Sequence, residues 1–162
     1  MAKADEIPGM VAHAPFREAA ATALEVRACE LFTLSSDVLD TSDIERVHDM
    51  RVATRRLRAV MEIFASAFPR KQYRGALREV KALADALGER RDPDVAIKGL
   101  EKVAGALRIE DRPGFEGLIA RFRDEQRVAN ARLAEALDTM HDDGLEERLM
   151  SMAAEARGAV AA

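Results

Sequence analysis

The chain has 162 residues, a formal net charge of −4 and only 4% aromatic residues. That length fits one domain with one hydrophobic core, and no apolar run approaches the roughly 20 residues of a membrane span. The single cysteine, Cys29, excludes an internal disulfide and fits a reducing compartment. Because the first ten residues also lack the apolar segment of a signal peptide, we expect a cytoplasmic protein.

Helical periodicity runs through most of the chain, and strand-like alternation is absent from it. Residues 1–13 lack a clear period, so we interpret them as a flexible arm. The spacing of apolar residues predicts helices at about 15–34, 43–67, 71–87, 92–107, 115–140 and 145–156. These predict an all-α fold, an antiparallel helical bundle of about five to six helices over residues 14–157, with a frayed tail at 158–162.

Local signals predict where some of these helices begin and end. Thr41, Ser42 and Asp43 are all good N-caps for the second helix, and Ser42 with Glu45 forms the S-x-x-E pattern of a capping box. Gly88 is a natural residue to follow the last turn of the third helix. Asp92 and Pro93 suit the N-cap and first position of a separate fourth helix.

The charge is distributed unevenly along the chain. Residues 46–91 hold 12 Lys or Arg and 5 Asp or Glu, whereas the rest of the chain holds 13 Lys or Arg and 24 Asp or Glu. A protein that coats nucleic acid is more often basic throughout. A basic block between acidic flanks indicates a confined anion site, and it argues against nucleic acid as the main ligand.

The most informative segment is Arg46–Arg58, with five arginines and one histidine in thirteen residues. At about 100° per residue, a helix here places most of its basic side chains in one stripe roughly 80° wide. The stripe consists of His48, Arg51, Arg55 and Arg58. The opposite side is apolar, with Met50, Ala53, Leu57, Val60 and Phe64. Like charges at this spacing repel by roughly 0.2–0.5 kcal/mol per pair, and few acids are interspersed, so a polyanionic ligand would explain the pattern.

The third predicted helix carries a companion set of cations. Arg74, Arg78 and Lys81 are spaced i, i+4, i+7 and share one face. If the two helices pack antiparallel, these faces border one groove. Arginine forks match phosphate oxygens, and the scarcity of aromatic residues favours phosphates without stacked bases. The alternative is a surface whose arginines pair with acids, either within the chain or on an acidic protein partner, which would make the protein a helical scaffold.

Signals for catalysis are weak. The chain has no Gly-rich phosphate loop, no paired-cysteine metal spacing and no nucleophile–base pattern. His48 has no second histidine at i+4, so we do not expect a metal site. We therefore expect a non-enzymatic protein without a cofactor.

Two motifs together resemble a known family. The segment HDMRVATRRLR at residues 48–58 resembles the H-x-x-R-V-x-x-R-R-L-R signature of the CHAD domain, the conserved histidine α-helical domain. In that family a lysine-bearing helix leads to a Leu-Gly turn and then to R-D-x-D-V. Here Lys81 is followed by Leu87-Gly88 and by RDPDV at residues 91–95. The resemblance covers the chain from about Ala19 to Leu137.

The resemblance implies a helical module that binds inorganic polyphosphate through a basic surface or pore, and that can direct proteins to polyphosphate granules. The family's basic residues carry over by motif to His48, Arg51, Arg55, Arg56, Arg58, Lys81 and Arg91. Arg56 lies about 100° from Arg55 around the helix, so we expect it to face a neighbouring helix. Family members usually contain two related halves. This chain has one clear copy of the signature, so we expect two copies to form a symmetric homodimer.

Overall fold

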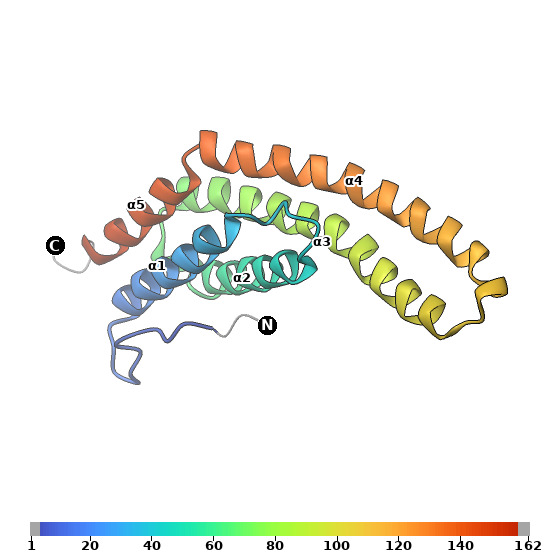
Figure 1. Ribbon diagram of the computed structural model, residues 1–162. Coiled ribbons are helices and arrows are strands. Elements are labelled where there is room, and N and C mark those ends of the chain that lie inside the picture. The colour runs from blue at the N-terminus through green and yellow to red at the C-terminus, as the bar shows by residue number, and fades with distance from the viewer. Residues whose placement is uncertain (1–3, 159–162) are drawn as a thin grey trace.

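The computed structural model describes residues 4–158, which form five α-helices and no strand (Figure 1). They are α1 (Phe16–Ser35), α2 (Ile44–Ile63), α3 (Arg70–Ala106), α4 (Pro113–Asp142) and α5 (Leu145–Gly158). Short 3-10 turns follow α2 at Ala65–Ala67 and precede α4 at Ile109–Asp111. The prediction of an all-α bundle is confirmed.

One hydrophobic core joins all five helices at one end of the molecule. On α3 this core reaches Leu87, and on α4 it begins at Leu133. Beyond the core, α3 and α4 continue side by side as a two-helix arm that projects past the other helices on the right of Figure 1. The site described below lies where α2 packs along the core half of α3.

Helix α2 forms because one side of it is apolar and the other is polar. Met50, Ala53 and Leu57 are at most 1% exposed and lie in the core, as the periodicity predicts. The helix starts one residue later than a Ser42 capping box would place it. Asp43 is the N-cap, and its Oδ1 accepts a hydrogen bond from the Glu45 backbone N–H at 3.1 Å. The predicted capping box is wrong because Ser42 belongs to the preceding turn, where its backbone N–H donates to Asp40 at 2.9 Å.

Helix α3 replaces two of the predicted helices. It runs through Gly88, Asp92 and Pro93 without interruption, so the predicted end at Gly88 and the predicted new start at Asp92 are both wrong. A proline inside a helix removes one backbone hydrogen bond, and it usually bends or breaks the helix. In Figure 1, α3 changes direction along its length but continues. Packing against α4 compensates, since Pro93 and Ile97 are both buried in the half of α3 that has left the core.

The remaining differences are small. The second helix was expected to reach residue 67, but it ends at Ile63 and a 3-10 turn follows. Of the predicted frayed tail, only Gly158 lies within the described residues, as the last residue of α5. The flexibility expected of residues 1–13 stays a prediction. In the structure, Asp5 contacts α1 by two hydrogen bonds, from its N–H to Glu30 Oε1 at 2.5 Å and from Arg27 Nη2 to its carbonyl at 3.0 Å.

The continuity of α3 predicts the effect of substituting its glycine. Gly88→Ala should raise the free energy of unfolding by about 0.5–1 kcal/mol, because alanine is the better helix former and no atom lies within 4 Å of the added Cβ. Urea unfolding measures the change. Gly144→Ala is the control and should destabilise, since Gly144 has a φ of +61°. A destabilised Gly88→Ala variant would indicate a left-handed turn at this position and contradict the continuous helix.

Candidate anion-binding site

The cationic side of α2 opens on a surface depression of about 490 Å³ between α2 and α3. We call it the basic depression. Its lining residues are His48, Arg51, Val52, Arg55, Arg56 and Arg58 from α2, with Ala84 and Asp85 from α3. The structure therefore brings together all five of the basic residues predicted from the first motif.

The direction of these side chains follows from the packing of α2. With its apolar stripe in the core, the opposite stripe must face solvent, and Arg51 and Arg55 are exposed. His48, Arg56 and Arg58 are half-buried along the sides of the helix. Arg56 was expected to face a neighbouring helix instead of the groove. It lines the same depression as the others, because α3 crosses close enough for the groove to include the side of α2.

The arginines of this surface differ from those of α4 and α5 in their ion pairs. Arg51 and Arg55 form no ion pair with any residue between 4 and 158. By contrast, every arginine of α4 and α5 has an acidic partner. Arg157, for example, binds Glu25 and Glu18 of α1, and its hydrogen bonds to these carboxylates, chiefly to Glu25, raise the pKa of Arg157. Internal acids therefore neutralise the arginines of α4 and α5 but leave Arg51 and Arg55 available.

One acid does reach the edge of the depression. Glu62, on the last turn of α2, lies 3.7 Å from Arg58 and 3.6 Å from Lys81 of α3. This contact places Lys81 beside the end of the α2 stripe, as the predicted groove requires. All three side chains are about half exposed, and exposed pairs of this kind contribute only about 0–1 kcal/mol. A polyanion can therefore displace Glu62 at small cost.

Arg78 and Arg74 lie one and two turns before Lys81 on α3, and both are exposed. Neither lines the basic depression. Neither forms an ion pair within the described part of the chain. Their i, i+4, i+7 spacing with Lys81 extends the cationic surface along α3, past the end of α2.

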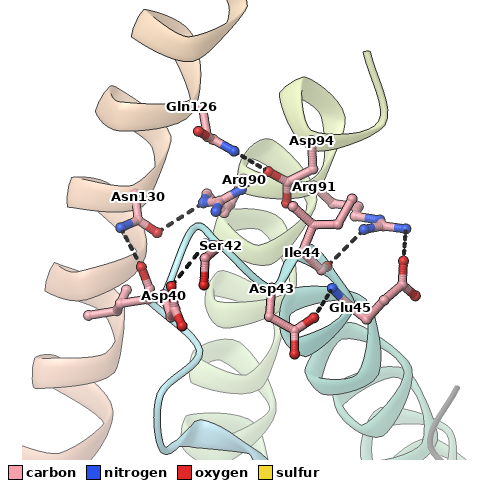
Figure 2. Close-up of polar contacts among 11 residues, drawn as sticks. Asp40, Ser42, Asp43, Ile44, Glu45, Arg90, Arg91, Asp94, Gln126 and Asn130 are labelled. Carbon is pink, nitrogen blue, oxygen red and sulfur yellow. Dashed lines mark hydrogen bonds and ion pairs between the residues drawn. The ribbon is translucent and has the colours of Figure 1, made fainter. Parts of the chain in front are cut away.

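Arg91, one of the two site residues predicted from the second motif, holds two helices together. Its Nη1 donates to the Ile44 carbonyl at 2.8 Å, and its Nη2 lies 3.8 Å from a carboxylate oxygen of Glu45 (Figure 2). The side chain is 16% exposed and does not line the basic depression. Arg91 thus ties α3 to the first turn of α2, and it sets the spacing between the two walls of the site.

Next to Arg91 lies a buried polar network that the sequence analysis did not identify. Arg90 and Asp94 are 0% and 1% exposed and form an ion pair one turn apart. Two residues of α4 complete the network: Asn130 accepts from Arg90 Nε at 2.9 Å, and Gln126 donates to Asp94 at 2.7 Å (Figure 2). Spacing could have revealed it, because Arg90 and Asp94 continue the 3–4 pattern of buried positions that ends with Leu87.

A second, larger hollow of about 590 Å³ lies beside this network, between α3, α4 and the segment before α2. It also carries cations, but each has an acidic partner. The pairs are Lys98 with Glu45, Arg123 with Glu101 and Arg127 with Asp124. The basic depression is therefore the stronger candidate for an anion site, although it is the smaller of the two.

Comparison with known proteins agrees with this geometry. The family model described as CHAD domain matches residues 22–162, which is most of the chain. The chain belongs to the CHAD domain family. Neither the curated proteins nor the solved structures contain a match. In this CHAD domain the first motif lines the basic depression, whereas the second motif joins α3 to α2 and α4.

Two other features of this CHAD domain bear on function. Within residues 4–158, no three His, Cys, Asp or Glu side chains are grouped so that they could hold a metal ion. None of the helices in that same range is long and apolar enough to cross a membrane.

The buried pair predicts a large stability effect at Asp94. Asp94→Ala should lower the free energy of unfolding by about 3–5 kcal/mol, because it leaves the Arg90 charge buried without its partner. Urea unfolding followed by circular dichroism measures the change. The matched control is Asp92→Ala, two residues away on the exposed side of α3, which should change stability by no more than about 0.5 kcal/mol. Equal stability of the two variants would mean that the buried pair does not hold α3 to α4.

Proposed function

We propose that this CHAD domain binds inorganic polyphosphate through the basic depression and the adjoining cations of α3, and that it catalyses no reaction. The observation that carries the proposal is the availability of Arg51 and Arg55. Both are exposed in the basic depression, and neither is neutralised by an acid of the described chain. Binding to polyphosphate would place the protein at polyphosphate granules.

The mechanism is multivalent electrostatic attraction. From His48 to Arg58 the stripe rises about 15 Å along the helix axis, which is long enough to meet several phosphates of one chain. Each arginine presents a planar fork of donors that suits phosphate oxygens. Neutralising successive phosphates releases their counterions, so affinity should fall steeply as salt rises, as it does for nucleic-acid backbones.

We propose binding without turnover because of the types of side chain that line the basic depression. The described lining residues are His48, four arginines, Asp85 and two small apolar side chains. They include no Ser, Thr or Cys hydroxyl or thiol that could act as a nucleophile. The few aromatic residues of the chain also favour a ligand without bases to stack.

Single arginine substitutions test the proposal. Arg51→Ala or Arg55→Ala should weaken polyphosphate binding and reduce the salt slope by about one unit each, since each removes one phosphate contact. Helicity should stay unchanged because both side chains are exposed. Calorimetric titration with polyphosphates of several lengths measures the effect. Single-stranded DNA of similar total charge is titrated separately for comparison. Arg121→Ala is the matched control, because Arg121 is exposed on α4 and paired with Glu125.

Affinity that climbs with phosphate number and exceeds that for DNA would support the proposal. Absent binding, or equal binding to both polyanions, would contradict it. The function would then be that of a helical scaffold whose arginine face meets an acidic protein partner. Unfolding of either variant would show that these arginines are structural.

We also propose that two copies form a symmetric homodimer that joins their basic faces around one polyphosphate. The two faces are both cationic and repel each other, so the dimer should tighten when polyphosphate is present. Sedimentation velocity with and without polyphosphate measures this. Arg121→Ala should dimerise like the unmodified protein. The double variant Arg51→Ala/Arg55→Ala should lose the increase in dimerisation that polyphosphate causes. A monomer under all conditions would contradict the dimer.

A further inference from the structure

His48 lies in the basic depression without a hydrogen-bond partner. Its side chain is half-buried and lines the same hollow as the four arginines of α2. Neither ring nitrogen forms a hydrogen bond or ion pair with any residue between 4 and 158. Glu45, one turn before His48, pairs with Arg91 and Lys98 of α3 instead. Both ring nitrogens of His48 are therefore available to a ligand.

The charged groups that share the basic depression with His48 come from α2 and α3. Helix α2 supplies the four arginines, and α3 supplies Asp85. Three more charged residues lie close to His48 in the chain or the fold, but none of them lines the hollow: Glu45, Asp49 and Arg91. No described residue of α1 lines it either. The charges that face His48 are therefore mostly positive before a ligand arrives.

A bound phosphate chain changes this balance of charge. Imidazole is the side chain that titrates near neutral pH, with an ordinary pKa of about 6.5. Its neutral form has one N–H donor, whereas the imidazolium form has two and carries a positive charge. Negative charge near an imidazole favours the protonated form. Polyphosphate brings several negative charges into the hollow, so binding and protonation of His48 should favour each other.

We propose that His48 takes up a proton when polyphosphate enters the basic depression, so that its imidazolium joins the four arginines in binding phosphate oxygens. This rests on the proposed function and adds a regulation to it. The complex favours the protonated form more than the free protein does. Affinity is therefore highest at low pH and falls as the pH rises through neutrality. His48 thereby makes the retention of polyphosphate depend on pH.

The test compares affinities for one long polyphosphate at about pH 6 and about pH 8, on either side of the imidazole range, at equal ionic strength. A long chain is used because its terminal phosphates, which titrate near pH 6, are then a small part of its charge. The unmodified protein should bind about tenfold more tightly at the lower pH, as one pKa unit of change at one group implies. His48→Gln keeps a hydrogen-bonding side chain without a titrating charge, so its affinity should change by less than about twofold.

The matched control is the double variant His13→Gln/His141→Gln. It removes the other two histidines of the chain, which lie outside the basic depression. It should keep the full pH dependence of the unmodified protein.

A second measurement records the proton directly. Calorimetric titration at one neutral pH, in two buffers with different heats of ionisation, gives the number of protons taken up on binding. The unmodified protein should take up more than His48→Gln does. His48→Lys places a permanent positive charge at the same position. It should therefore bind at the higher pH about as tightly as the unmodified protein binds at the lower pH.

Each alternative result has a distinct meaning. If His48→Gln keeps the pH dependence of the unmodified protein, another group takes up the proton and the proposal is overturned. If His48→Gln binds too weakly to compare, His48→Lys decides, because a pH dependence that survives the lysine overturns the proposal. Equal binding of the unmodified protein at both pH values also overturns it, and the proposed function then stands. Absence of binding at both pH values overturns the proposed function itself.

Discussion

The burial of the apolar stripe of α2 is the interaction on which the rest of the site depends. Met50, Leu57 and Met61 are completely buried, and each contributes about 1.5–3 kcal/mol relative to an exposed position. Repulsion between the arginines on the other side amounts to only roughly 0.2–0.5 kcal/mol per pair. Burial therefore dominates and fixes the rotation of α2, so the cations must face outward whether or not a ligand is present.

The second wall of the site depends on α3 keeping its place. Arg91 ties α3 to the first turn of α2, and the Arg90–Asp94 pair joins it to α4 through Asn130 and Gln126. These contacts lie one to two turns beyond Asp85, at the point where the core ends. The second family motif thus holds the wall of the site in register, while the side chains of the first motif line the basic depression.

The pairing of acids differs between the basic depression and the two C-terminal helices. Every arginine of α4 and α5 has an acidic partner, and some of these pairs join helices that are distant in sequence, as Glu79 does with Arg148. At the basic depression, Glu62 and Asp85 differ in their pairing. Glu62 shares its charge between two cations at the edge. Asp85 lines the basic depression and forms no ion pair within the described residues.

The sequence alone was sufficient for the helical class, for the rotation of α2 and for the basic residues of the first motif. Helical periodicity is a local property, so the spacing of Met50, Ala53 and Leu57 also determined the side on which Arg51 and Arg55 emerge. Periodicity placed His48 in the same stripe, the family motif added Arg56, and the structure places all of them on one depression.

The tertiary structure decided what local signals could not. Gly88 and Pro93 favour the end of a helix, yet α3 continues because packing against α4 outweighs the missing backbone hydrogen bond. The same packing buries Arg90 and Asp94, which as single residues look like surface charges. The packing of α3 against α2 gives Arg91 the Ile44 carbonyl to bind and brings Asp85 opposite the arginines of α2. Such contacts join residues that are far apart in the chain, and only the folded arrangement of α2, α3 and α4 determines them.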